Sequence, residues 1–362
     1  MDNHSTENSE DTVIDNAGGG LRGLRAQPSA QLFEAVRDSY GINGLEDSID
    51  LGGSSSLNLL VTDAHNRYVV RVYRPYVTEA RLADVQLARN EVRANGVPTS
   101  ELIRTLDGQQ WIIFDHRLVE VERYVESDLV MDSWELLLAG LPLLGRIHTI
   151  LRGMQFSIDG KNPLFANYIA PEKALATTLQ GTQRIRGWPP SSYNQRLADA
   201  ADELAHLVSD HEKEFITMLP RQVVHGDYWD NNVFFRDGRI VLVTDFDFMG
   251  ERTRIDDLAL ILYYCCIGGN YGDSAAVTDE LLRKLRNLID AYNEGLDERL
   301  SMEERLALPL AIARQPLSGI GGWVALLDDE RAAKRHAQGM LGEVEWALDI
   351  PRNLDRWRAA FA

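Results

Sequence analysis

The sequence has very few cysteines: its 362 residues include two, the neighbours Cys265 and Cys266. A disulfide between adjacent residues requires strained geometry, so a framework of structural disulfides is excluded. The first residues also lack the basic stretch and apolar run that mark a secretory signal peptide. We therefore expect a protein of a reducing compartment, located in the cytoplasm.

Long apolar runs are scarce as well. The two longest, residues 136–144 and 258–267, are shorter than the roughly 20 residues that a membrane-spanning helix needs. We expect both to form buried helices, and no interaction with a membrane is predicted.

Basic side chains are outnumbered by acidic ones. Lys and Arg total 37 whereas Asp and Glu total 55, which gives a formal net charge of −18. Because nucleic-acid phosphates are bound by clustered Lys and Arg, this balance excludes a broad nucleic-acid surface. The acidity fits either a cationic small-molecule partner or solubility alone.

The chain is long enough for two lobes. Residues 1–27 open with an acidic stretch and continue through three glycines, so we predict a disordered acidic tail. Residues 28–122 show the alternation of a strand-rich part, and residues 123–362 are mainly helical in pattern. The predicted boundary between the two lobes lies near residue 122.

Local patterns predict the individual elements. In the first lobe we expect helices at 31–36 and 78–94, a hairpin of strands 57–62 and 68–73, a second hairpin around Asp107-Gly108, and a strand at 119–125. In the second lobe we expect helices at 133–151, at 193–215 and from 256 onward, with a hairpin around Asp237-Gly238. Residues 156–190 are predicted to be irregular, and turns are expected near 268–269 and 319–322.

Three polar side chains lie on short connections on either side of the 237–238 hairpin. Asp227 follows an apolar strand, Asn232 comes five residues later, and Asp245 ends the return strand. Phosphoryl transfer needs a carboxylate that accepts the proton of the attacking hydroxyl. It also needs an amide oxygen and a second carboxylate to hold Mg²⁺ against the triphosphate. This order of residues is therefore typical of a kinase active site.

The run from His225 through Gly226 and Asp227 to Asn232 resembles the aminoglycoside phosphotransferase and choline kinase family of the protein-kinase-like superfamily. The resemblance implies a bilobal α+β fold, with a small antiparallel-sheet lobe and a larger, mostly helical lobe. It also implies ATP or GTP and Mg²⁺ as cofactors. By the same resemblance Asp227 is the catalytic base, Asn232 and Asp245 are metal ligands, and Asp247 supports the metal.

The first lobe resembles the family more loosely. Gly52, Gly53, Ser54 and Ser55 resemble a glycine-containing loop that binds phosphate. Arg71 stands where most members have Lys, with Glu91 as its partner. Glu122 and Tyr124 lie in the segment that would bind the nucleotide base. Small residues in such a loop let backbone amides approach phosphate closely. Arg71 is expected to neutralise phosphate charge during transfer.

The acceptor is not encoded in a recognisable motif. Trp229 and Asp230 adjoin the predicted base and are candidate substrate contacts, although Trp229 fits equally well as a packing residue of the loop. The first hypothesis is a phosphotransferase for an aminoglycoside-like or other antibiotic. The alternatives are a metabolic kinase for homoserine, choline or a similar hydroxyl metabolite, a protein Ser/Thr kinase, and a nucleotide-binding pseudoenzyme. A monomer or a homodimer fits the sequence.

Overall fold

The computed structural model describes residues 25–53, 56–64, 66–164, 166–267 and 277–362. Most of the predicted tail, the residues Ser54 and Ser55, and the turn near 268–269 lie outside the described residues. Contacts divide the chain into two compact units. The first comprises residues up to 79 together with 100–125, and the second comprises 80–99 together with 126–362.

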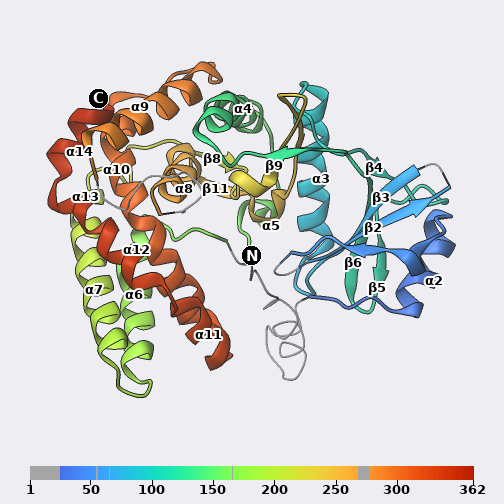
Figure 1. The fold of residues 1–362 in the computed structure, drawn as a ribbon, viewed down its shortest axis with the longest axis horizontal. Coiled ribbons are helices and arrows are strands. Elements are labelled where there is room, and N and C mark those ends of the chain that lie inside the picture. Colours follow the sequence, from blue (N-terminus) through green and yellow to red (C-terminus); the bar gives the residue numbers. More distant parts are fainter. Residues whose placement is uncertain (1–24, 54–55, 65, 165, 268–276) are drawn as a thin grey trace, which may run out of the picture. The chain divides into compact units, whose positions relative to one another are not determined.

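The first unit is an antiparallel sheet with one helix (Figure 1). Its strands are β1 (Ile49–Asp50), β2 (Leu57–Asp63), β3 (Asn66–Val72), β4 (Leu102–Ile103), β5 (Ile112–Phe114) and β6 (Arg117–Arg123). They are ordered β1-β2-β3-β6-β4, and β5 also pairs with β6. The helix α2 (Ala30–Tyr40) and the short η1 (Leu45–Asp47) complete the unit. Leu32 and Val36 of α2 share one buried apolar cluster with Leu57 of β2 and Val119 of β6.

The predicted hairpin around Asp107-Gly108 is wrong in its strand pairing. The turn exists, since the backbone N–H of Gly108 donates to the carbonyl of Thr105 at 2.9 Å. The flanking strands β4 and β5 nevertheless pair with β6 rather than with each other. The reason is the tight turn at Asp115 and His116, both with positive φ, which folds β5 directly onto β6.

The second unit carries the helix α3 (Glu79–Ala94, from residue 80 on) and two small sheets. One sheet pairs β10 (Arg239–Val243) with β9 (Val233–Arg236) and β7 (Leu129–Val130). The other pairs β8 (Arg221–Val224) with β11 (Gly250–Thr253). The predicted hairpin at Asp237-Gly238 is confirmed as the β9–β10 connection. The strand β8 leads into the predicted catalytic loop.

Helices make up the rest of this unit, in agreement with the predicted α+β class (Figure 1). They are α4 (Trp134–Arg152), α5 (Ile158–Lys161), α6 (Pro171–Arg186), α7 (Ser192–Glu212), α8 (Arg254–Ile267), α9 (Asp279–Glu294), α10 (Met302–Leu317), α11 (Glu330–Ala337), α12 (Met340–Ala347), α13 (Asp349–Arg352) and α14 (Leu354–Phe361). Between α10 and α11 the chain forms the π-helix η5 (Ser318–Val324). Their buried faces share one large apolar core.

Among the described residues, α4 alone is long and apolar enough to cross a membrane by length and composition. Its buried face, which includes Leu137, Leu141 and Ile147, belongs to the core of the second unit. The core helix of a folded domain meets the same criteria, so this helix is weak evidence for a membrane span.

Two predictions about loops are wrong, and one packing arrangement explains both. Residues 156–190 include the 16-residue helix α6 rather than irregular chain, and residues 319–322 lie in the π-helix η5 rather than in a turn. The two helices pack closely, because a Cβ at Gly181 of α6 would lie 2.3 Å from the carbonyl oxygen of Ile320. The buried residues of α6 include Thr178, Gly181 and Thr182, which are not recognisable as a core-facing stripe in the sequence.

Candidate active site

The predicted catalytic loop leaves β8 through His225 and Gly226. The side chain of His225 is completely buried. Its Nδ1 accepts from the backbone N–H of Asp227 at 3.2 Å, and its Nε2 lies 3.1 Å from the carbonyl oxygen of Thr244, to which it donates. Burial lowers the pKa of His225 to about 4, so the imidazole is neutral and can make both bonds. His225 thereby joins the loop that carries Asp227 to the strand end that carries Asp245.

Gly226 has no room for a side chain. Its φ is +87°, and a Cβ would lie 2.0 Å from the carbonyl oxygen of Phe248. The loop containing Asp227 and the loop containing Asp245 are therefore in direct backbone contact at this residue.

We expect Gly226→Ala to lower kcat by about 100-fold or more, because misplacing reacting groups by about 1 Å costs that much. The matched control is Gly238→Ala, since Gly238 has a similar φ of +70° and open space around its Cβ position. The control should show the backbone strain without the displaced loop. Steady-state kinetics and melting temperatures of both variants test this expectation. Equal activity of the two variants would contradict it.

A buried hydrogen-bond network also holds Gly226. Asp257, at the start of α8, accepts from the backbone N–H of Gly226 at 2.9 Å and contacts Nε2 of His148 at 2.9 Å. The other ring nitrogen of His148 lies 2.7 Å from the hydroxyl of Tyr292. Although burial opposes ionisation of Asp257, the hydrogen bond and charge of His148 hold its pKa below the ordinary value. The carboxylate of Asp257 therefore holds the backbone of the catalytic loop in place.

The carboxylate of Asp227 is held by two amide side chains. Its Oδ1 accepts from Nδ2 of Asn167 at 2.9 Å, and its Oδ2 accepts from Nδ2 of Asn232 at 3.0 Å. The same Nδ2 of Asn232 donates to the carbonyl oxygen of Asp227 at 2.8 Å. Asn232 thus stands five residues after Asp227 and contacts it, while its predicted role as a metal ligand stays a prediction. Asn167 was not predicted, since it lies in a segment without a motif.

Asp245 follows β10 in an unusual backbone conformation. Its φ of +63° lies in the left-handed region, which costs free energy for a residue with a side chain. Burial, and after it the negative charge of Asp245, raises the pKa of Asp227 to about 8, against the hydrogen bonds from Asn167 and Asn232. The two carboxylates therefore share a region of negative potential.

These side chains suit a divalent cation. Within the described residues no group of three His, Cys, Asp and Glu side chains is arranged as a metal site. The candidate ligands are instead the carboxylate of Asp245 and the amide oxygen of Asn232, whose nitrogen is already used by Asp227. Oxygen ligands of this kind, with the rest supplied by water and phosphates, suit Mg²⁺. The mutual repulsion of Asp227 and Asp245 is what a cation would relieve.

The loop after Asp245 is anchored by an arginine that sequence reasoning missed. Arg81 of α3 is buried, and its Nη2 donates to the carbonyl oxygens of Asp247 at 2.8 Å and Met249 at 2.6 Å. Its Nη1 donates to the carbonyl oxygen of Gly160 at 2.6 Å. The predicted metal-supporting residue Asp247 is half-buried in this loop, and its role stays a prediction.

The predicted substrate residues lie on the same loop as the base. The ring of Trp229 packs against that of Tyr264 of α8, with centroids 4.9 Å apart. Asp230 is buried, and its backbone carbonyl accepts from the N–H of Met131 at 3.0 Å. Trp229 therefore has a packing role, while its predicted contact with substrate stays untested.

The described part of the predicted phosphate loop is shaped by its glycines. Gly52 and Gly53 both have positive φ. The carbonyl oxygen of Gly52 accepts from Nδ2 of Asn58 at 3.0 Å, and that of Gly53 accepts from Nε of Arg25 at 3.0 Å. Ser54 and Ser55 lie outside the described residues.

Of the other predicted nucleotide residues, Arg71 and Glu122 lie on strands of the first unit, Tyr124 directly follows β6, and Glu91 lies in the second unit. Arg71 is buried on β3, opposite Glu120 of β6. Glu122 accepts from the hydroxyl of Ser100 at 2.6 Å, and Tyr124 carries the guanidinium of Arg67 over its ring. Glu91 lies on the exposed face of α3, in the second unit, and accepts from Asn95 at 3.0 Å. Its pairing with Arg71 stays a prediction.

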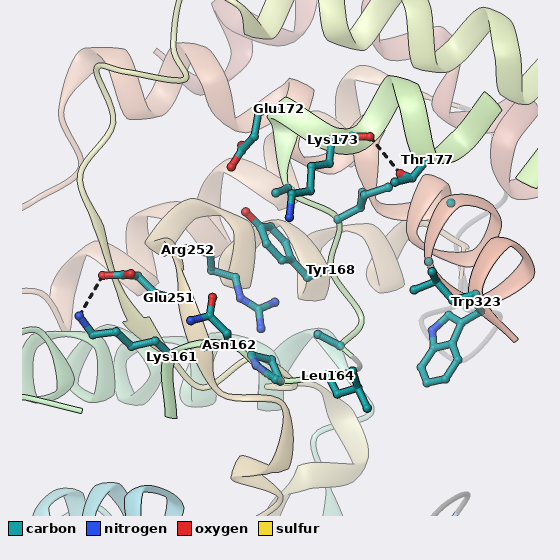
Figure 2. A pocket seen from close by; sticks show the side chains of 18 of the residues that line it. Lys161, Asn162, Leu164, Tyr168, Glu172, Lys173, Thr177, Glu251, Arg252 and Trp323 are labelled. Carbon is teal, nitrogen blue, oxygen red and sulfur yellow. Dashed lines mark hydrogen bonds and ion pairs between the residues drawn. The ribbon is translucent and has the colours of Figure 1, made fainter. Parts of the chain in front are cut away.

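The second unit also contains a cavity of about 390 Å³ (Figure 2). Its walls come from residues 161–164 and 166–170, the first turns of α6, the strands β8 and β11, and η5. Residues on either side of Asn167, namely Ala166 and Tyr168, line it. The cavity is thus bounded by the segment that holds the carboxylate of Asp227.

A buried loop aspartate joined to an asparagine five residues later, with a second aspartate across a hairpin, defines a kinase-like phosphotransferase site. The comparison with protein families agrees: residues 48–295 match the model of the phosphotransferase enzyme family, and the chain belongs to that family. The enzyme class predicted from the sequence, transfer of phosphate to a hydroxyl, is confirmed.

Individual relatives are distant. The chain is 25% identical over 261 residues to a homoserine kinase of Rhodopseudomonas palustris. This alignment covers 71% of this chain and 72% of the relative. Among solved structures, an amicoumacin kinase in complex with AMP-PNP, Ca²⁺ and Ami superposes with a TM-score of 0.65 at 14% identity, covering 90% of this chain and 94% of the other. A microcompartment-associated aminopropanol kinase gives a TM-score of 0.64 at 17% identity, covering 90% and 98%. These likenesses confirm the protein-kinase-like fold.

Proposed function

We propose that this protein transfers the γ-phosphoryl group of ATP or GTP to the hydroxyl of a small amine-bearing metabolite, with a hydroxy amino acid such as homoserine as the first candidate. The observation that supports the proposal most strongly is the contact of Asn232 with Asp227, whose pKa is raised by burial and then by the charge of Asp245. Together these residues supply a base and two metal-ligand groups.

In the proposed reaction the acceptor oxygen forms a bond to the γ-phosphorus while the bond between that phosphorus and the leaving diphosphate oxygen breaks. The proton of the acceptor hydroxyl passes to the carboxylate of Asp227. Asn167 and Asn232 fix the orientation of that carboxylate through their hydrogen bonds. Orientation of this kind is worth several kcal/mol in enzymes, roughly 7–11 kcal/mol at the extreme.

Asn232 and Asp245, with Asp247 in support, would hold Mg²⁺, which when bound neutralises charge on the triphosphate. In the first unit, Gly52 and Gly53, Arg71, Glu122 and Tyr124 are proposed to bind the nucleotide. Glu91 is proposed to pair with Arg71, and Trp229 and Asp230 are proposed to adjoin the acceptor. Residues 28–122 would then bind the nucleotide, and residues 123–362 would carry the catalytic residues and bind the acceptor.

The relatives favour the metabolite over the antibiotic that the sequence alone put first. The sequence relatives are named homoserine kinase, at 25% identity in the case of Rhodopseudomonas palustris. An antibiotic acceptor is the second candidate, because the enzyme shares its fold with an amicoumacin kinase.

A coupled assay of ADP release tests the proposal. The panel should contain L-homoserine, choline, ethanolamine and several aminoglycosides, each with ATP and with GTP. We expect saturable turnover of L-homoserine and a phosphomonoester signal in ³¹P NMR. Turnover confined to antibiotics, together with resistance of a sensitive host that expresses the protein, would replace the first candidate by the second. Absence of transfer to any acceptor would contradict the proposed function.

A further inference from the structure

The cavity of the second unit has the opposite charge from the protein as a whole. Four cationic side chains line it, Lys161, Lys173, Arg221 and Arg252, against two carboxylates, Glu172 and Glu251. One of these carboxylates is partly neutralised, since Lys161 lies 3.5 Å from Glu251. A local excess of positive charge in a chain of net charge −18 favours an anionic group in this cavity.

Arg252 is the innermost of these cations. It is only 2% exposed, and its guanidinium lies 4.4 Å from the ring centroid of Tyr168. One nitrogen, Nη2, donates to the carbonyl oxygen of Phe248 at 2.7 Å. A planar guanidinium that is held by stacking and by one hydrogen bond keeps further N–H groups for a planar acceptor such as a carboxylate.

The helix α6 adds a second source of positive potential. It begins at Pro171, and its N-cap residue Ala170 lines the cavity without providing a side-chain cap. Pro171 has no N–H, and the N–H of Lys173 already donates to the carbonyl oxygen of Ala170 at 2.9 Å, so what α6 contributes is the positive end of its helix dipole. Lys173, in the first turn, projects into the same opening as Tyr168 and Arg252 (Figure 2).

Two contacts connect this cavity to the catalytic loop. Asn167, which holds Oδ1 of Asp227, stands between the lining residues Ala166 and Tyr168. Arg252 also adjoins the catalytic loop, because a Cβ built on Gly226 would lie 2.8 Å from its Nη2. An anionic group bound beside Arg252 and Tyr168 would therefore lie next to Asn167 and Gly226, the two residues that adjoin Asp227.

We propose that this cavity binds the carboxylate of the acceptor, so that the kinase selects hydroxy amino acids over the amino alcohols that lack the carboxylate. The inference rests on the proposed function and specifies its substrate class. The side chains of Arg252 and Lys173 supply the recognition, the positive end of the α6 dipole favours the bound charge, and Arg221 adds positive charge.

Matched pairs of acceptors give the first test. L-Homoserine and 3-aminopropan-1-ol differ only in the carboxylate, as do L-serine and ethanolamine. A charge-assisted hydrogen bond is worth about 1.5–3 kcal/mol, so we expect kcat/KM to favour the hydroxy acid of the preferred pair by about 10- to 100-fold. Equal kcat/KM values within that pair, or preference for the amino alcohol, would overturn the inference while leaving the kinase function intact.

A cavity-filling variant gives the second test. Gly322 lines the cavity, and a Cβ built there meets no atom within 4 Å, so Gly322→Leu extends into open space. The matched control is Gly342→Leu on α12, where a Cβ is equally unobstructed and which does not line the cavity. We expect the first variant to raise KM for L-homoserine about tenfold or more and the control to leave it unchanged.

The charge of Lys173 is tested separately by Lys173→Gln, with Lys213→Gln as the surface control. The first variant should raise KM for L-homoserine and leave kcat/KM for 3-aminopropan-1-ol unchanged, because only the carboxylate has lost a partner. Equal effects on both compounds would overturn the inference.

Calorimetry separates failure of this inference from failure of the proposed function. If neither the hydroxy acid nor the amino alcohol accepts phosphate, the proposed acceptor class is refuted. Direct titration of L-homoserine into the wild type then tests whether the cavity binds the carboxylate. Binding that is lost in Gly322→Leu and kept in Gly342→Leu would support a carboxylate site. Absence of binding to the wild type would overturn it.

Discussion

Asp227→Asn is expected to lower kcat by about 10³- to 10⁴-fold, the contribution of a positioned general base together with its orientation. The amide matches the carboxylate in size but cannot accept the proton of the acceptor hydroxyl. It also keeps only one acceptor oxygen for the two amide donors, Asn167 and Asn232. Single-turnover measurements with L-homoserine and ATP would separate this loss from any change in binding.

The stability of this variant gives an independent check. Burial and the charge of Asp245 raise the pKa of Asp227, so in the free protein the ionised carboxylate is disfavoured by the fold. This cost is absent at low pH and grows as the pH rises toward the raised pKa. A neutral amide removes it, and we expect the melting temperature at pH 7 to stay constant or rise. Turnover like that of the wild type would contradict the assignment of Asp227 as base.

Asp245→Ala is expected to remove the Mg²⁺ dependence of nucleotide binding. Two oxygen ligands from the protein are proposed, and loss of the carboxylate leaves only the neutral amide of Asn232. We expect the affinity for ATP in the presence of Mg²⁺ to fall by about 100-fold or more, toward the affinity measured in EDTA. Isothermal titration with and without Mg²⁺ measures both values.

The control for this variant lies at the other end of the same hairpin. Asp237 also has a positive φ, 50° against 63° for Asp245, and it is exposed in the β9–β10 turn. Asp237→Ala therefore imposes a similar backbone cost without removing a ligand. Nucleotide affinity that stays dependent on Mg²⁺ in Asp245→Ala would assign the metal to other residues.

The spacing of residues explains why the sequence could place the candidate base and its neighbours close together. Asp227 and Asn232 lie on one loop, so their separation of five residues constrains the distance between their side chains. Asp245 is brought to the same loop by a short hairpin, whose Asp237-Gly238 turn is recognisable by itself. Local sequence therefore encodes this constellation, and its geometry follows from short connections.

The residues that sequence reasoning missed arrive from distant segments. Asn167 contacts Asp227 across 60 residues, and Arg81 contacts the carbonyl oxygen of Asp247 across 166. An isolated Asn or Arg carries no spacing signal, so neither could be recognised before the chain was folded. The same holds for Arg252, whose proposed role in binding a carboxylate depends on the stacking of its guanidinium on the ring of Tyr168.

The failure to predict the helix α6 has a different physical cause. The buried face of α6 consists largely of small or hydroxyl-bearing residues, including Ala174, Thr178 and Gly181. A face of this kind packs closely against η5 but contributes little apolar contrast along the sequence. The π-helix η5 lies against this face, as the close approach of Gly181 to Ile320 shows.

The central claim is that Asn232 and Asp245 act on one metal ion beside Asp227. A crystal structure with Mn²⁺ and a non-hydrolysable triphosphate tests it most directly, because anomalous scattering locates the ion independently of its ligands. We predict a peak about 2.0–2.3 Å from an oxygen of Asp245 and from the amide oxygen of Asn232. A metal and triphosphate bound away from both side chains would contradict the account.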